Sequence, residues 1–164
     1  MSKDVTQKED KMKVDTRVFG TVDIDDNKII HFIGGIVGFP DLTDFALIHD
    51  AEQDYTAPIK WLQSIQEPQF AMPVMDPLFV SPEYNPVVEN ELLKPIEMQD
   101  PDSILVLVTI TVPKDIKNMT VNLQTPFVIN ADAKKACQIV VDTDKYPVRF
   151  PIYDILNAKK KEGK

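Results

Sequence analysis

The sequence predicts a single compact all-β domain with a barrel-like fold and one or two short helical turns. Three observations support this fold class: the chain length, the alternation of apolar residues in short segments, and the thirteen prolines that mostly lie between those segments. A chain of 164 residues with 43% hydrophobic residues can bury one sizeable core and is short for two ordinary domains. Short alternating segments that are separated by turn residues are typical of sandwiches and barrels.

The first expected strands form a meander and lie at residues 14–19, 21–24 and 28–33. Residues 25–27, with the sequence Asp-Asp-Asn, tolerate the tight turn that this meander requires. Further strands are expected at residues 45–49, 59–64 and 70–74. Proline cannot donate a hydrogen bond to a sheet ladder, so the prolines between these segments mark strand ends.

The clearest strand covers residues 104–112, which read ILVLVTITV. Every second residue from Ile104 onward is apolar, and we expect this face to be buried throughout. The other face changes from Leu105 and Leu107 to two threonines, as in a strand that curls around a closed sheet. A second, half-buried strand begins at Met119. From these faces, the expected core includes Val106, Val108, Ile110, Val121, Leu123 and Ile139.

Helix is expected only at residues 89–93 and 153–161. The polar residues 1–12 are expected to form a disordered N-terminal extension, residues 13–153 the β domain, and residues 154–164 a flexible basic tail. Residues 1–13 contain no apolar core of a signal peptide, and no apolar run in the chain approaches the length of a membrane span, so we expect a cytoplasmic protein. The absence of a coiled-coil repeat favours a monomer.

The acidic charge of the chain has two interpretations. The net charge is −8, and residues 159–164 contain four lysines and one glutamate, which leaves −11 on residues 1–158. Residues 82–102 contain one base, Lys94, and six acids, which are Glu83, Glu89, Glu91, Glu97, Asp100 and Asp102. Such a surface attracts basic proteins and repels nucleic acid through its long-range field. The other interpretation, which charge alone favours, is a solvated loop that only keeps the protein in solution.

No catalytic, cofactor-binding or metal-binding residues are expected. Cys137 is the only cysteine and lies in an apolar run, so a buried thiol is expected. His31 and His49 have no second metal ligand near them in the sequence. Asp23 begins a pattern like that of a calcium loop, but the glycine and the glutamate that such a loop requires are absent. Trp61 is expected in the core.

Four segments resemble those of one known family, in the same order. They are residues 34–45 (GGIVGFPDLTDF), 59–77 (IKWLQSIQEPQFAMPVMDP), 119–130 (MTVNLQTPFVIN) and 138–152 (QIVVDTDKYPVRFPI). In these segments the chain is similar to the flagellar assembly factor FliW family, and the similarity spans about residues 14–152. Two features depart from the family pattern: Thr125, where many members have a smaller residue, and the N-terminal extension.

The resemblance implies a cytosolic regulator that is not an enzyme. It implies that the chain binds flagellin before export and, when flagellin is scarce, binds the small basic RNA-binding repressor CsrA, so that translation of flagellin is released. Within the acidic segment, Glu89, Glu91 and Glu97 are candidate partner-binding residues. Asn122 and Asn130 are further candidates, although asparagine beside a turn more commonly bonds to the backbone.

An alternative function is that of an OB-like nucleic-acid-binding barrel, which the β content permits. The net charge of −8 argues against this function, because phosphate contacts need clusters of Lys and Arg. An enzyme would need a pocket with convergent ionisable groups, and the sequence displays no motif for such a pocket.

Overall fold

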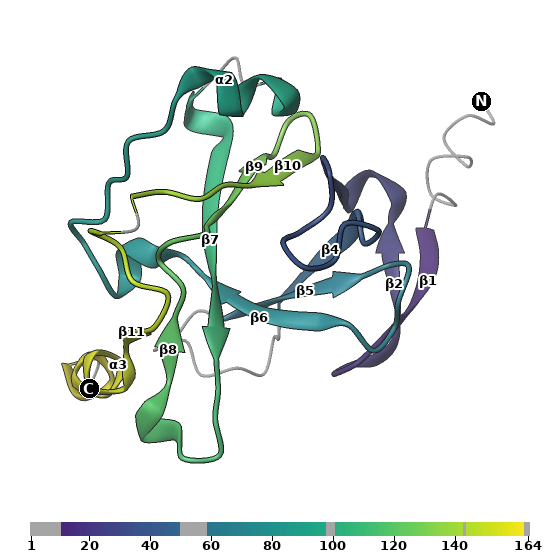
Figure 1. The fold of residues 1–164 in the computed structure, drawn as a ribbon. Helices are drawn as coiled ribbons and strands as arrows, with labels where there is room; N and C mark the ends of the chain where they lie inside the picture. The colour runs from purple at the N-terminus through teal and green to yellow at the C-terminus, as the bar shows by residue number, and fades with distance from the viewer. Residues whose placement is uncertain (1–10, 50–58, 98–100, 143, 163–164) are drawn as a thin grey trace.

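Seven strands close into a barrel in the computed structural model, which describes residues 11–49, 59–97, 101–142 and 144–162 (Figure 1). The strands are β3 (Ile29–Phe32), β4 (Asp44–His49), β5 (Lys60–Ser64), β6 (Ala71–Met75), β7 (Ile104–Thr111), β9 (Phe127–Asn130) and β10 (Lys135–Gln138). Around the barrel they follow the order β7, β6, β5, β4, β3, β10 and β9, and β9 pairs with β7 again. These pairings are antiparallel except that between β3 and β10, which is parallel.

Smaller elements surround the barrel. β1 (Lys11–Thr16) and β2 (Gly20–Asp25) form a separate hairpin, whereas β8 (Thr120–Val121) and β11 (Phe150–Pro151) extend the sheet beside β7. The α-helices are α2 (Asn90–Leu93) and α3 (Tyr153–Glu162). The single 3-10 turns are η1 (Asp26–Lys28), η2 (Pro77–Phe79), η3 (Lys94–Ile96), η4 (Pro101–Ser103) and η5 (Ile116–Asn118).

Strand β7 joins the two parts of the sheet because it is longer than its neighbours. On one edge, its first half pairs with β9, where Leu107 lies opposite Phe127. The end of the same edge pairs with β8, where Ile110 lies opposite Val121. The other edge pairs with β6. The branched apolar residues of β7 suit this position, because such side chains fit a pleated surface that is covered on both faces.

One apolar core fills the interior of the barrel. The ring of Phe32 lies edge-on to the rings of Phe45 and Phe127, with ring centroids 5.2 and 5.3 Å away. Edge-to-face pairs of this kind contribute about 0.5–1.5 kcal/mol beyond the burial of their area. The same cluster contains the buried side chains of Leu62, Val74, Leu107 and Ile129.

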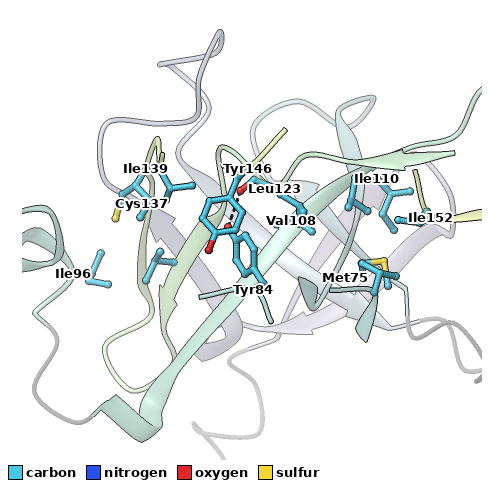
Figure 2. Packing of buried hydrophobic residues seen from close by; sticks show 14 residues of the cluster. Met75, Tyr84, Ile96, Val108, Ile110, Leu123, Cys137, Ile139, Tyr146 and Ile152 are labelled. Carbon is cyan, nitrogen blue, oxygen red and sulfur yellow. Dashed lines mark hydrogen bonds between the residues drawn. The ribbon is translucent and has the colours of Figure 1, made fainter. Parts of the chain in front are cut away.

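A second core covers the outer face of β7. Because side chains alternate along a strand, Val108 and Ile110 point away from the barrel interior that Leu107 fills. They belong to one cluster with buried side chains of segments 76–97 and 139–152, among them Tyr84 and Tyr146 (Figure 2). The buried side chains that these segments contribute are Val80, Tyr84, Ile96, Ile139, Val141, Tyr146 and Ile152.

The all-β prediction is confirmed, and five of the six expected core residues are buried. Val106 is only partly buried, because it lines a groove in the outer core. Val112, on the face that we expected to be buried throughout, is 54% exposed because it lies beyond the end of β7 at Thr111. Trp61 is also only partly buried, since it alternates with Leu62 and therefore lies on the outer face of β5.

The N-terminal strand differs from its expected range. β1 begins at Lys11, so that two residues of the expected extension are part of a strand, and residues 1–10 lie outside the described residues. β1 ends at Thr16 and not at residue 19, because the chain turns there and Gly20 adopts a left-handed φ of 69°.

Both expected helical segments are helical. The segment at residues 89–93 contains α2, and the segment at residues 153–161 forms α3. α3 includes residues that we assigned to a basic tail, and its Ile155 and Leu156 pack against the outer core. The division of the chain into extension, domain and tail stays a prediction.

Candidate partner-binding surface

Residues 81–97, called the strap below, cross the outer core and include α2 and η3. The acidic residues that we considered for partner binding belong to this strap. Glu89 precedes α2, is exposed, and forms no ion pair within the described part of the chain. Glu91 pairs with Lys94 at 2.9 Å, but both side chains are largely exposed. Such a pair contributes only about 0–1 kcal/mol, so these charges are not required for the fold.

Glu97 and Asn130 meet at the end of the strap. Glu97 has a left-handed φ of 58°, and its carboxylate pairs with Lys135 of β10. Asn130 is buried, and its Nδ2 donates to the carbonyl oxygens of Ile96 and Glu97 at 2.8 and 3.3 Å. Its Oδ1 accepts from the backbone N–H of Asp132 at 3.1 Å. Asn130 therefore anchors the strap to the barrel through the backbone bonding that we considered as its ordinary role.

Asn122 lies toward the other end of β7. Its Oδ1 accepts hydrogen bonds from the backbone N–H groups of residues 124 and 125, at 3.0 and 3.1 Å, and so tightens the turn before β9. The residue before Asn122 pairs with Ile110, whereas Asn130 pairs with Ile104. At about 3.3 Å per residue, this separation along β7 is roughly 20 Å. The structure therefore brings Glu97 and Asn130 together and leaves Asn122 apart from them.

An apolar groove of about 350 Å³ lies beside the strap, and the sequence reasoning missed it. The strap contributes Val88 and Leu93, η2 contributes Leu78, and β7 contributes Val106. The groove is lined by Asp76, Pro77, Leu78, Tyr84, Asn85, Pro86, Val88, Leu93, Ile104, Leu105, Val106 and Val128. The sequence signal that could have indicated this groove was Val87, an apolar residue in a proline-rich segment without apolar alternation. Val87 is 93% exposed in the structure.

Two tyrosines fix the strap at the groove. Tyr84 donates its hydroxyl hydrogen bond to the carbonyl oxygen of Leu123 at 2.8 Å, and its ring lies edge-on to that of Tyr146 with centroids 4.8 Å apart (Figure 2). The hydroxyl of Tyr146 accepts from the backbone N–H of Asn85 at 3.2 Å. Burial, with a smaller contribution from Tyr146, raises the pKa of Tyr84 to about 12. The pair therefore ties the strap to the segments before β9 and β11.

The Leu-Gln-Ser string, part of the family-like segment 59–77, has a structural role. The side chain of Gln63 is 1% exposed, and its Nε2 donates to the carbonyl oxygens of Pro68 and Phe70 at 3.0 and 3.2 Å. Ser64 is also buried, and its Oγ accepts from the backbone N–H groups of residues 66 and 67. These bonds close the β5–β6 turn without a catalytic partner for the serine among the contacts described.

Close packing requires the second glycine of the pair in the family-like segment 34–45. Gly35 has a left-handed φ of 75°, and a Cβ atom added there would lie 2.5 Å from the carbonyl oxygen of Pro40. The turn thereby positions Val37, whose backbone N–H donates to Oε1 of Gln138 at 2.7 Å. The tight turn at Gly35 and the side chain of Gln138 therefore hold this loop.

The residues with potential for chemistry lie apart from one another. Cys137 is buried as expected, and burial raises the pKa of its thiol. His31 contacts Asp44 at 2.8 Å on the surface. Across the ranges that the structure describes, no three His, Cys, Asp or Glu side chains gather as a metal site would require. No helix within those ranges is long and apolar enough to cross a membrane.

This chain shares its fold with a solved protein structure. It matches the crystal structure of the flagellar assembly factor FliW with a TM-score of 0.78, over 87% of this chain and 97% of that chain. The sequence identity in this match is 24%, so the match establishes the shared fold alone.

Sequence comparison establishes the family. The model of the FliW protein family matches residues 13–152. The flagellar assembly factor FliW of Lachnospira eligens is 48% identical over 93% of this chain and 100% of its own length. That of Lachnoclostridium phytofermentans is 39% identical over 93% of this chain and 99% of its own length. The chain belongs to the FliW family of flagellar assembly factors.

Proposed function

We propose that this chain is a cytoplasmic flagellar assembly factor that binds flagellin and antagonises the translational repressor CsrA by direct protein–protein binding. Binding to CsrA relieves the repression of flagellin translation. The observation that carries this proposal is the family match over residues 13–152, together with 48% identity to a relative of nearly the same length. The chain acts as a monomeric binding protein, without catalysis, a cofactor or direct contact with RNA.

Electrostatics supports the repressor part of the proposal. The chain has a net charge of −8, and the exposed carboxylates of Glu83 and Glu89 form no ion pairs in the described ranges. An acidic surface attracts a basic RNA-binding protein and accelerates their encounter. Once docked beside the RNA-binding surface, the same charge repels the phosphates of the message. One surface therefore both recruits the repressor and opposes its RNA.

Flagellin regulates its own translation if flagellin and CsrA both bind this chain and the amount of the chain is limiting. A ligand that occupies the chain lowers the free concentration available to the other partner by mass action. While flagellin accumulates in the cell, little free chain remains and CsrA represses translation. After flagellin is exported, the chain is released and removes CsrA from the message.

The test uses the purified chain, flagellin, CsrA and a flagellin leader RNA. The expected result is that the chain binds both proteins, releases the RNA from CsrA, and loses this effect when excess flagellin is added. Direct titration of the chain with the RNA alone serves as the control and should give no binding. Failure of the parent chain to bind either protein would overturn the proposal, and RNA binding by the chain alone would favour the OB-like alternative.

A further inference from the structure

We propose that the apolar groove beside the strap holds an amphipathic α-helix of a protein partner, with aliphatic side chains in the groove and Lys or Arg on its flanks. The proposal rests on the proposed function in that the partner is a protein bound by this chain. It adds the location of the contact and the chemistry of the segment that is recognised.

The walls of the groove favour aliphatic side chains. Leu78 and Val88 line one part of it, and Ile104, Val106 and Val128 come from the adjoining strands. The volume of about 350 Å³ is at the lower end of the roughly 300–1,000 Å³ range of small-molecule sites. A helix laid in such a groove places residues i, i+3, i+4 and i+7 against these walls.

The polar groups of the groove do not converge on a small ligand. The hydroxyl of Tyr84 is already bonded to the carbonyl oxygen of Leu123. Oδ1 of Asp76 accepts from the backbone N–H of Leu78 at 2.9 Å and so caps η2. Small-molecule sites use a few precisely placed polar groups to orient the ligand. In this groove the hydroxyl of Tyr84 and Oδ1 of Asp76 bond to the protein itself, which favours a macromolecular occupant.

The rim of the groove carries exposed apolar side chains. Leu78, Val87 and Leu92 are 51%, 93% and 44% exposed, and each lines the groove or lies next to a residue that does. Scattered exposed apolar residues are ordinary, but a contiguous group around a groove marks an interaction site. The surface offered to a partner is therefore wider than the groove itself.

The charges around the groove select the flanks of the occupant. Asp76 lines the groove, and Glu83 and Glu89 lie on the strap beside groove residues. These three carboxylates are exposed and form no ion pair with any residue that the structure describes. Lys94, the base of the strap, already pairs with Glu91. A helix with Lys or Arg beside its apolar face complements this arrangement, and one with Glu or Asp is repelled.

The groove is formed before a partner binds. The Tyr84 and Tyr146 hydroxyls fix one end of the strap, and Asn130 fixes the other through the carbonyl oxygen of Ile96. Near α2, the thiol of Cys137 lies 3.7 Å from the carbonyl oxygen of Leu92. A preformed site avoids much of the entropy cost of ordering a surface on binding.

The first test compares affinities for purified flagellin and CsrA. The variants Leu78→Ser and Val88→Ser should each weaken binding of one of these partners at least tenfold. Val37→Ser is the matched control, because Val37 is 65% exposed and lies in the loop before β4, outside the groove. Thermal melting of each variant confirms folding. Equal affinities of parent, groove variants and control for both partners would overturn the proposal.

A second test identifies the bound segment. A photo-crosslinking amino acid at position 78 should capture a partner segment with aliphatic residues at helical spacing and flanking Lys or Arg. Capture of an extended or acidic segment would show that the occupant is different.

A third test separates this proposal from the proposed function. An 18-residue synthetic helix with leucines at i, i+3, i+4 and i+7 and lysines elsewhere should bind the parent chain at least fivefold more tightly than Leu78→Ser. The same helix with glutamates in place of the lysines should bind neither the parent chain nor the Leu78→Ser variant. If the parent chain fails to bind flagellin and CsrA but binds this peptide, the proposed function has failed and the groove proposal stands. If parent and variant bind the peptide equally, or neither binds, the groove proposal is overturned.

Discussion

Oε1 of Gln63 accepts a hydrogen bond from the backbone N–H of Arg17 at 3.0 Å, and this contact joins the β1–β2 hairpin to the barrel. The guanidinium of Arg17 also donates to the carbonyl oxygen of Ala71 at 3.3 Å. Since β1 and β2 form a sheet of their own, the hairpin depends on such contacts for its position. Gln63 thus connects the β5–β6 turn and the hairpin through one buried carboxamide.

The variant Gln63→Leu should lower the free energy of unfolding by about 1–3 kcal/mol. The substitution keeps the volume but leaves the carbonyl oxygens of Pro68 and Phe70 and the N–H of Arg17 without this partner. Urea denaturation measures the change, and hydrogen exchange should accelerate in β1 and β2. The control is Gln69→Leu, at an exposed position of the same turn, which should change stability by less than about 0.5 kcal/mol. Equal stability of the two variants would contradict this role for Gln63.

Val108→Asp should unfold the protein, whereas Val112→Asp should not. Val108 is buried in the outer core, and an unpaired buried carboxylate costs several kcal/mol against a typical total stability of about 5–15 kcal/mol. Val112 follows in the same alternation but is 54% exposed. Thermal melting followed by circular dichroism distinguishes the two. A cooperative melt of Val108→Asp within a few degrees of the parent would show that the outer core tolerates charge.

The variant Tyr84→Phe should lower the free energy of unfolding by about 0.5–1.5 kcal/mol near neutral pH, because the hydrogen bond to Leu123 is lost. Tyr153→Phe is the control, since in the described chain Tyr153 makes no hydrogen bond through its hydroxyl and is only partly buried. Denaturation of both variants beside the parent measures the difference. A loss of the same size in the control would mean that the hydroxyl bond of Tyr84 adds nothing.

The raised pKa of Tyr84 also predicts the direction of a pH effect. The pKa rises from 10.0 to about 12 on folding, so the folded state binds the proton more tightly than the unfolded chain. The stability from this group is therefore fully present below pH 10 and is lost as pH rises through the folded pKa. Denaturation curves across this range should show a smaller alkaline loss in Tyr84→Phe than in the parent. A parallel loss in both proteins would assign the alkaline effect to other groups.

Neutralising Glu89, Glu91 and Glu97 to Gln should slow the association with CsrA. The loss should be greatest at low salt, because the Debye length is about 30 Å at 0.01 M. Flagellin binding should change less than CsrA binding, because the apolar groove would supply most of the contact with an amphipathic flagellin segment even though Glu89 lies beside it. Association rates against ionic strength provide the measurement.

The control for this triple variant carries the same change of charge elsewhere. Three exposed acids lie outside the acidic segment, namely Asp26, Asp41 and Asp144. Their replacement by Asn removes the same amount of negative charge from another part of the surface, and so shows the effect of net charge alone. Equal slowing by both triple variants would show that only net charge matters. Unchanged rates for the Gln variant would leave the acidic segment as a feature of solubility and would place the repressor contact elsewhere.

Local periodicity along the chain was enough to predict several elements of the fold. The alternation from Ile104 onward predicted β7 and the burial of Val108 and Ile110. Asn122 beside its turn predicted bonding to the backbone. These features follow from residues that are neighbours in the chain, because alternation decides which side chains share a face. The four family-like segments also indicated the family without any structure.

Which faces are covered and which distant segments meet could not be predicted from local patterns. The barrel closes through the parallel pair of β3 and β10, about a hundred residues apart in the chain, and no local pattern records such a pairing. Val106 shares its face with Val108 yet remains partly open in the groove, because burial depends on where the strap crosses β7. Likewise, the pairing of Glu97 with Lys135 and its contact with Asn130 exist only because the strap returns to the barrel there. Periodicity specifies the direction of a side chain, whereas long-range packing decides what that side chain meets.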